Sequence, residues 1–203
     1  MPKNMVSNVE RANRQKDPLE SLPKSHRERQ VNGHTFHLVA LPAPDPKSKT
    51  KAWLMDLMTR NMKSLYEGVS WGWDPEAKEK EMFEDAAWFL IATESNSGIP
   101  LAFSHFRFDN DYGHEVLYVY ELQVEESNRG QGLGRTLMGT LELLATHNKM
   151  EKLILTVLKN NAGARRFFKK TMGLKRDYTC PRDSHEETFD YEILSKSTNK
   201  CYK

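Results

Sequence analysis

The stretch YVYELQVEESNRGQGLGRT, residues 118–136, decides the fold because it joins a strand, a glycine turn and the start of a helix. Residues 118–124 are mostly apolar and predict a strand, and the segment from Arg135 to about Asn148 has helical spacing. Glycines let the backbone approach a phosphate closely, and the first N–H groups of a helix have no partner within it. The stretch therefore indicates an anion site at a helix N-terminus.

The glycine spacing excludes two nucleotide-binding motifs. A dinucleotide fingerprint that starts at Gly130 needs a glycine at position 135, where this chain has Arg135, and the Gly-Lys-Ser/Thr of a P-loop is absent. A second strand over residues 153–157 precedes the pattern Asn161-x-x-Ala164-x-x-Phe167-Phe168. Either motif alone is weak evidence for a ligand site, since a glycine turn is usually only a loop. The two motifs together, at this separation, are strong evidence for one.

Composition limits the class of protein. The chain has 203 residues, 38% of them hydrophobic, which predicts one substantial core and one domain with extensions. Its 30 basic and 28 acidic residues leave a net charge of +2, so no overall field favours nucleic-acid binding. We expect an intracellular protein without a signal peptide or membrane span. Cys180 and Cys201 are expected to be free thiols, and no spacing predicts a metal site.

The segments before the glycine turn predict an extension, one strand and two helices. Residues 1–30 are polar, with a short helix-compatible piece around residues 9–13, and a first strand is expected at residues 35–41. From Lys51, apolar residues recur at three- and four-residue spacing, which predicts an amphipathic helix that ends at Tyr66. Asp74-Pro75 begins a charged helix, which we expect to be a solvated surface.

The remaining segments complete a sheet. Residues 88–93 and 101–108 predict a hairpin, residues 109–113 a turn, and residues 174–179 and 188–194 two last strands. The fold class predicted is α/β (α+β), a mixed central sheet of about seven strands with helices on both faces. The domain boundaries predicted are an extension over residues 1–30, partly helical and packed on the domain, a domain over residues 31–195 and a polar tail over residues 196–203.

The two motifs resemble those of the Gcn5-related N-acetyltransferase (GNAT) superfamily. Arg129-x-x-Gly132-x-Gly134 is similar to its pyrophosphate loop, and the Asn161 pattern to its Asn-x-x-Ala-x-x-aromatic helix. The resemblance implies the GNAT fold, acetyl-coenzyme A as co-substrate and no metal. It implies a coenzyme site made of Leu122, Gln123 and Val124 for the pantetheine arm, Arg129, Gly130, Gln131, Gly132, Leu133, Gly134 and Arg135 for the pyrophosphate, and Asn161 for a pantetheine amide.

A closer resemblance is to the N-alpha-acetyltransferase D family, which acetylates the N-terminal serine of histone tails that begin Ser-Gly-Arg-Gly. It is carried by Tyr66-Glu67, Trp71-Gly72-Trp73, residues 102–109 and 115–118, Tyr120-Glu121 and residues 155–157. It implies a monomeric enzyme of the cytoplasm and nucleus that needs no auxiliary subunit and contacts neither nucleic acid nor membrane. It implies an acceptor groove lined by Tyr66, Trp71, Asp109, Asp111, Tyr120, Thr156 and Tyr191.

Glu121 is the candidate general base, with Tyr120 beside it. Acetyl transfer needs a neutral amine, and an N-terminal amine, with a pKa of about 8, loses its proton readily to one carboxylate. By strand alternation Glu121 is expected to share a face with Leu117 and Val119, where apolar neighbours would raise its pKa. Without the resemblance, a structural acid is an equally good interpretation of Glu121.

Other interpretations stay open at this point. Asp109 and Asp111 are ordinary turn formers, and the aromatics Tyr66 and Trp71 are as well explained by core packing. The chain is also compatible with an acetyltransferase for lysine or small amines, or with a module that binds coenzyme or a tail without catalysis. A lysine side chain, with a pKa of about 10.4, would need a stronger base arrangement.

Overall fold

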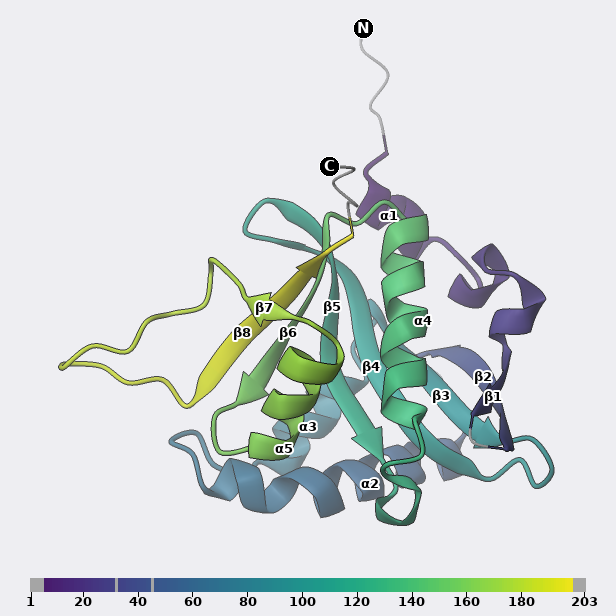
Figure 1. Ribbon diagram of the computed structural model, residues 1–203, viewed down its shortest axis with the longest axis horizontal. Helices are drawn as coiled ribbons and strands as arrows, with labels where there is room; N and C mark the ends of the chain where they lie inside the picture. The colour runs from purple at the N-terminus through teal and green to yellow at the C-terminus, as the bar shows by residue number, and fades with distance from the viewer. Residues whose placement is uncertain (1–5, 32, 45, 199–203) are drawn as a thin grey trace, which may run out of the picture.

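One sheet with helices on both faces forms the body of the protein (Figure 1), and the computed structural model describes residues 6–31, 33–44 and 46–198. Within these residues eight strands lie in the order β1-β2-β3-β4-β5-β6-β8-β7. All neighbouring strands are antiparallel except β5 and β6. The bounds of the strands are β1 Glu28–Val31, β2 His34–Pro42, β3 Ala87–Glu94, β4 Pro100–Asp111, β5 His114–Val124, β6 Lys152–Leu158, β7 Lys175–Arg176 and β8 Tyr191–Ser197.

The helices divide between the two faces of the sheet. Their bounds are α1 Asn8–Asn13, α2 Ser48–Glu67, α3 Pro75–Met82, α4 Leu133–His147 and α5 Ala162–Arg166, with short turns η1 Pro18–Ser21, η2 Lys24–His26, η3 Glu126–Asn128 and the π-helical η4 Phe167–Thr171. In Figure 1, α4 and α5 lie in front of the sheet, and α2 and α3 lie behind its lower part. The predicted mixed sheet with helices on both faces is therefore confirmed.

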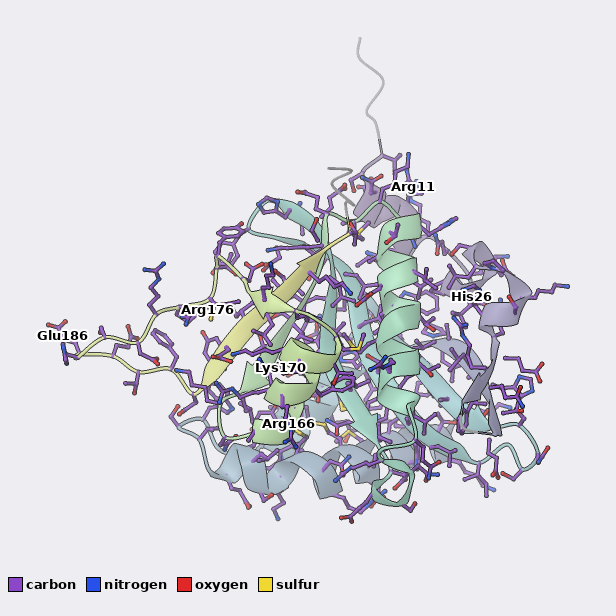
Figure 2. The ribbon with its side chains drawn as sticks, viewed as in Figure 1. Arg11, His26, Arg166, Lys170, Arg176 and Glu186 are labelled. Atoms are coloured by element: carbon purple, nitrogen blue, oxygen red, sulfur yellow. The ribbon has the colours of Figure 1, made fainter. Side chains whose placement is uncertain are left out.

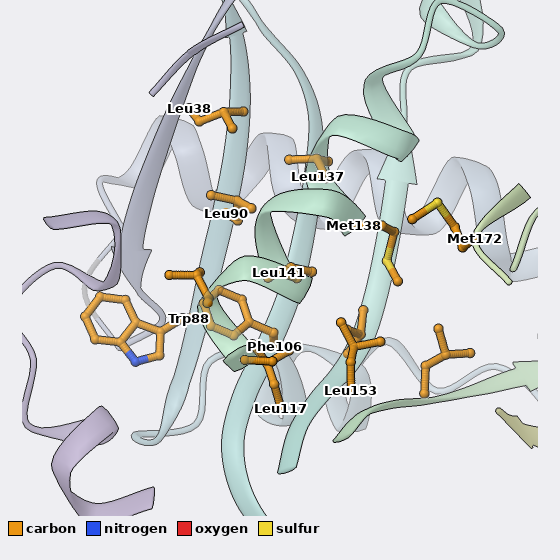
Figure 3. Close-up of a cluster of buried hydrophobic side chains, with 14 of the residues drawn as sticks. Leu38, Trp88, Leu90, Phe106, Leu117, Leu137, Met138, Leu141, Leu153 and Met172 are labelled. Carbon is orange, nitrogen blue, oxygen red and sulfur yellow. The ribbon is translucent and has the colours of Figure 1, made fainter. Parts of the chain in front are cut away.

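Each face has its own core because successive strand residues point to opposite sides. In front, Leu137 and Leu141 of α4 pack on Leu90, Phe106 and Leu117, as Figure 3 shows. Behind, a second cluster joins α2 and α3 to β3 and β4 through Leu54, Leu57, Met58, Met82, Phe89, Ile91 and Phe103. Burying each such leucine or phenylalanine contributes about 1.5–3 kcal/mol, so the two cores fix the sheet between its helices.

Several predicted elements differ from the structure. β1, which pairs with β2, was not predicted, so the sheet has eight strands and not about seven. The strand predicted at residues 174–179 is only the two-residue β7, and β8 begins at Tyr191. The expectation that α3 is a solvated surface holds for most of the helix, including Glu79 and Lys80, but fails at Lys78 and Met82, which are buried. Periodicity did not reveal this, since Lys78 has no apolar side chain to mark the inner face.

The first described residues pack on the sheet. Ala12 and Leu19 are fully buried. The Asn8 backbone N–H donates to Glu115 Oε1 at 2.7 Å, and Asn13 Nδ2 donates to the Phe108 carbonyl at 3.0 Å. These bonds attach α1 to the β4–β5 hairpin.

The β4–β5 hairpin is longer than predicted. Its two turn residues, Tyr112 and Gly113, have φ angles of 48° and 82°, the left-handed geometry of a tight two-residue turn. The prediction that Asp109 and Asp111 lie in the turn is therefore wrong. Both residues lie in β4, opposite Val116 and His114. The sequence prediction failed because polar residues on the exposed side of a strand end have the same composition as a turn.

A buried ion pair ties the edge strand β7 to β6. Lys152 Nζ lies 2.7 Å from Asp177 Oδ2, and the two side chains are 11% and 2% exposed. Burial alone would raise the pKa of Asp177, but bonds from Lys152, Ser195 and Thr179 hold it well below its usual range. Because this carboxyl is more acidic in the folded state, its stabilisation is present above the unfolded pKa of about 3.9 and is lost as the pH falls further.

We therefore expect Asp177→Asn to lower the free energy of unfolding by about 3 kcal/mol at pH 7, since it leaves Lys152 buried without its counter-ion. The difference from wild type should shrink below about pH 4. Urea unfolding at pH 7 and pH 3 measures both values, and Asp183→Asn, at an exposed pair, is the matched control. An equal loss at both pH values would contradict the account.

Candidate active site

The site begins where β5 and β6 separate. The two strands pair only over residues 116–119 and 152–155, and beyond them the strands part. Two adjoining pockets open there, which share Leu122, Gln123 and Asn161. The inner pocket is lined from α2, α3, β5, β6 and the segment after β6, and the loop pocket from α2, the end of β5, the glycine turn and α5.

A β-bulge in β5 sets which side chains enter the inner pocket. On β4, His105 pairs with Glu121 and the next residue, Phe106, pairs with Val119, so Tyr120 is an extra residue on β5. The expectation that Glu121 shares a face with Leu117 and Val119 is therefore wrong. Those two residues belong to the core under α4, whereas Glu121 meets α3 on the opposite face. Strand alternation failed because the bulge shifts its phase by one residue.

The Glu121 carboxylate is buried among polar groups. It is 5% exposed, and Oε1 accepts from Lys78 Nζ at 3.3 Å while Oε2 accepts from Gln123 Nε2 at 2.9 Å. Gln123 is held in turn by Asn61 Nδ2, which donates to Gln123 Oε1 at 3.0 Å. Burial raises the pKa of Glu121, and the Lys78 ammonium opposes that rise. The arrangement holds a proton acceptor at a pocket wall.

Tyr120 stands beside this carboxylate as a neutral hydroxyl. Burial raises its pKa above the usual value, although the Arg107 guanidinium, 4.5 Å from the ring centre, opposes the effect. The Tyr120 ring lies 4.8 Å from the Tyr118 ring, and the Tyr118 hydroxyl lies 2.6 Å from Thr156 Oγ1. Tyr118 and Thr156 therefore connect β5 and β6 across the pocket floor.

Aromatic side chains form the outer wall of the inner pocket. Tyr66 and Trp71 line it, and Trp71 is 50% exposed. The Tyr66 ring contacts Trp73 at 5.7 Å, and the Trp71 ring contacts Tyr191 at 5.8 Å between centroids. Burial raises the pKa of Tyr66 to about 12, so its hydroxyl is also neutral at physiological pH. A half-exposed tryptophan at a pocket mouth is suited to binding a ligand, whereas Trp73 is a packing residue.

Three of the predicted acceptor residues lie outside the pocket lining. Tyr191 approaches it only through Trp71, and Asp109 and Asp111 lie further along β4. By alternation both acids share the face of β4 that carries Arg107, the side to which Tyr120 also turns. Burial raises the pKa of Asp111. The acids therefore lie on the same face of β4 as Arg107 but beyond the residues that line the pocket.

The loop pocket contains almost all of the predicted coenzyme residues. Gly132, with a φ angle of 92°, is the N-cap of α4, and a Cβ added at Gly134 would lie 3.4 Å from the Phe167 ring. Arg166 (Figure 2) lines the pocket from α5. The residues predicted for the coenzyme that line it are Leu122, Gln123, Val124, Arg129, Gly130, Gly132, Leu133, Gly134, Arg135 and Asn161.

Gln131 and Asn161, both predicted to bind the coenzyme, already make hydrogen bonds within the protein. Gln131 is not in the lining, and its Nε2 donates to the Ser127 carbonyl at 3.2 Å. Asn161 Oδ1 accepts from the Ala164 N–H at 3.1 Å and caps α5, so a bond from Asn161 to a ligand would use its NH₂ group. The glycine backbone, the start of α4 and the three arginines Arg129, Arg135 and Arg166 fit a diphosphate, which needs close N–H donors and positive charge.

Sequence reasoning missed Lys78 and the side-chain role of Gln123. Gln123 was assigned only a backbone role, and Lys78 lies in a helix predicted to be solvated. The side chain of Gln123 shares a face with Glu121 only because of the bulge in β5, and no local sequence pattern predicts that bulge. In the described part of the chain no three His, Cys, Asp or Glu side chains gather as a metal site. None of the helices described there has the length and hydropathy needed to cross a bilayer.

Comparison with known proteins agrees with this geometry. The family model described as "Acetyltransferase (GNAT) family" matches residues 54–174. A GNAT acetyltransferase structure from Listeria monocytogenes is 14% identical, with a TM-score of 0.57 over 84% of this chain and 99% of that one. The PaiA N-acetyltransferase of Thermoplasma acidophilum, solved with coenzyme A, is 14% identical, with a TM-score of 0.57 over 80% and 98%.

A third structure is the ribosomal-protein-S18-alanine N-acetyltransferase of Escherichia coli, which is 16% identical, with a TM-score of 0.57 over 81% of this chain and 96% of that one. At such identities the structures show a shared fold. The family model goes further because it spans more than half of the chain and includes both pockets' main elements from α2 to α5. This chain is a member of the GNAT family of acetyltransferases, which use acetyl-coenzyme A.

Proposed function

We propose that this GNAT enzyme moves the acetyl group of acetyl-coenzyme A to the α-amine of the N-terminal serine of histone tails that begin Ser-Gly-Arg-Gly. The observation that carries the proposal is the buried Glu121 carboxylate beside Tyr120, at the wall of a pocket lined by the aromatics Tyr66 and Trp71. In this proposal Asp109 and Asp111, further along the face of β4 that carries Arg107, form the rim of the acceptor site. The resemblance of the segments around Tyr66, Trp71 and Tyr120 to histone-specific N-terminal acetyltransferases supports it. We further propose a monomer of the cytoplasm and nucleus.

The coenzyme would lie across both pockets. Its pyrophosphate fits the glycine turn before α4, and its pantetheine arm would follow residues 122–124, the part of β5 that has parted from β6. Backbone groups freed by that separation can bond the arm as an added strand would. The thioester carbon then lies in the inner pocket, near Glu121.

The reaction is a direct attack. The amine nitrogen adds to the thioester carbonyl carbon, the C–N bond forms, the C–S bond breaks and coenzyme A leaves as the thiolate. Before attack the α-ammonium group gives one proton to Glu121, directly or through water, which leaves the neutral amine. The N–H proton released when the C–N bond forms goes to the departing thiolate, and Glu121 returns its proton to solvent. The neutral Tyr120 hydroxyl, on the same pocket wall, can orient the nucleophile or water. An α-amine with a pKa of about 8 needs only one such base.

Selectivity would come from the rim and the aromatic wall. Asp109 and Asp111 can form charge-assisted hydrogen bonds to the arginine at the third position of the tail. Tyr66, Trp71 and Tyr191 would enclose the first residue, and Thr156, already bonded to Tyr118, would border it on β6. This arrangement favours a small first side chain followed by a cation.

Two other functions remain to be separated from this one: acetylation of lysine or small amines, and binding of coenzyme or a tail without catalysis. Mass spectrometry of a Ser-Gly-Arg-Gly-Lys peptide incubated with enzyme and acetyl-coenzyme A distinguishes all three. The proposal expects one acetyl group on the serine α-amine. Acetylation of the lysine alone, or of neither amine, would contradict it.

The first prediction concerns the base. Glu121→Gln should lower kcat by ~100-fold or more, because a positioned base contributes about that much, while the Michaelis constant for acetyl-coenzyme A stays unchanged. Steady-state kinetics with the Ser-Gly-Arg-Gly peptide measures both, with Glu20→Gln on the surface as control. Wild-type turnover in Glu121→Gln would remove this carboxylate from the mechanism.

The second prediction concerns the glycine turn. Gly134→Val places a branched side chain against Phe167 and the pocket, so the Michaelis constant for the coenzyme should rise ~10-fold, which corresponds to about 1.4 kcal/mol. Gly139→Ala, one and a half turns further along α4 where an added Cβ meets nothing within 4 Å, is the matched control. If folded Gly134→Val keeps the wild-type constant, the loop is only a turn.

The third prediction concerns the rim. Asp109→Asn should raise the Michaelis constant for the peptide more than that for the coenzyme, and the loss should be small with a Ser-Gly-Ala-Gly peptide. The double-mutant cycle should give a coupling of ~1–3 kcal/mol between Asp109 and the peptide arginine. Asp85→Asn, an exposed acid after α3, serves as control. Additive effects of the two changes would mean that Asp109 is not the arginine's partner.

A further inference from the structure

The helix α3 carries one lysine into the inner pocket. Lys78 is 9% exposed, whereas its helix neighbours Glu79 and Lys80 are exposed. The helix is fixed at its start by Asp74, whose carboxylate accepts from the Glu76 and Ala77 N–H groups, and near its end by the fully buried Met82. Lys78 is therefore held in place by a helix that is anchored at both ends.

The Lys78 ammonium is saturated with oxygen partners. Nζ lies 3.3 Å from Glu121 Oε1, 2.9 Å from Glu81 Oε1 and 3.2 Å from the Tyr66 hydroxyl. An ammonium has three N–H donors, so these three partners use all of them. Burial opposes the charge, but Glu121, Tyr66 and Glu81 together raise the pKa of Lys78 above its usual value. Lys78 is therefore a buried cation whose position is fixed by its hydrogen bonds.

We propose that Lys78 is a positioning residue whose ammonium keeps the Glu121 carboxylate ionised and oriented at the pocket wall. This inference rests on the proposed function, in which Glu121 accepts the proton of the amine. It adds a requirement that the resemblance to known enzymes did not supply. The base would work only because a cation from α3 compensates its burial.

The other groups that face Glu121 do not supply this charge. From α3, Glu81 has the same sign as Glu121, and from α2, Tyr66 is neutral. His105, the cross-strand partner on β4, is fully buried, and its pKa is lowered to about 3 by burial and then by Arg107 and Lys78, so it is uncharged. Gln123 on β5 donates a neutral hydrogen bond. Arg107 of β4 lies over the Tyr120 ring and donates to the Glu81 carbonyl and to Glu84. Among the described residues, Lys78 is thus the cation hydrogen-bonded to the Glu121 carboxylate.

The physical consequence is a balance between two opposing effects on one carboxyl group. Burial and Glu81 push the pKa of Glu121 upward, and Lys78 pushes it downward. Without the lysine the pKa of Glu121 would rise further, and a larger fraction of the carboxyl groups would already hold a proton and could not accept another. With the lysine the carboxylate is favoured, in a site where its basicity still exceeds that of a solvated glutamate.

The first test is the pH profile. In Lys78→Met the acidic limb of kcat for the Ser-Gly-Arg-Gly peptide should move to higher pH by about one unit or more, because that limb reports the base in the enzyme–substrate complex and not the amine of the free peptide. Lys78→Arg, which keeps the charge, should leave the limb in place, as should Lys80→Met on the exposed side of α3. The coenzyme Michaelis constant should not change. An unmoved limb in folded Lys78→Met would overturn the inference.

A second measurement needs no acceptor peptide. If Lys78 compensates Glu121, the Lys78→Met protein should contain a carboxyl group with a raised pKa, whose stabilising contribution is lost as the pH rises. Its unfolding temperature should therefore fall, relative to Lys80→Met, between pH 5.5 and pH 8. Adding Glu121→Gln should abolish that fall, because no buried charge is then left uncompensated.

The outcomes separate the two proposals. A wild-type enzyme that acetylates no serine peptide defeats the proposed function, and the stability measurement still tests Lys78. A Lys78→Met protein whose pH dependence matches Lys80→Met, or is not restored by Glu121→Gln, overturns the role of Lys78. Suppose that Lys78→Met does not fold at pH 8. In that case the inference is supported if Lys78→Met folds at pH 5.5 or if the Lys78→Met/Glu121→Gln protein folds at pH 8. If neither protein folds under these conditions, the inference is contradicted.

Discussion

The separation of β5 from β6, together with the bulge at Tyr120, is the constraint on which the site depends. A continuous pair of parallel strands would bond its backbone groups to each other and leave no opening. Here the pairing stops after Val119, and the extra residue turns Tyr120 and Glu121 toward α2 and α3. The parted strands thus leave an unpaired edge on β5, and the inserted residue sets a carboxylate beside that edge.

The bulge also decides what kind of environment the carboxylate has. Had alternation continued, position 121 would lie in the apolar core under α4, where an ionised group is strongly disfavoured. On the other face it meets the ammonium of Lys78 and the amide of Gln123. Burial of a charge is tolerated there because its partners are buried with it, and removing one partner would cost more than the pair contributes.

The two pockets are lined by different kinds of groups. The loop pocket is built from backbone groups and long basic side chains, which suit a diphosphate of fixed shape. The inner pocket is built from side chains of several elements, of which α3 lines the inner pocket without lining the loop pocket. This separation lets one family keep a coenzyme site while the acceptor varies.

Local features were predictable from the sequence because their causes lie within a few residues. The glycine turn before α4, the Asn161 cap of α5 and the Asp74 cap of α3 each depend on adjacent backbone groups. The two motifs indicated the family, and the family model over residues 54–174 confirms it. The acceptor residues stay predictions, since nothing in the comparisons tests them.

The sequence by itself thus determined the strand, glycine turn and helix around residues 118–148 and, through the two motifs, the family and its acetyl-transfer chemistry. Only the tertiary structure decided the neighbours of Glu121, the place of Lys78 and the strand position of Asp109 and Asp111. The reason is that the phase of a strand after a bulge depends on hydrogen bonds to another strand, here from β4. The inner side of a charged helix depends likewise on what it packs against, and neither partner is near in the sequence.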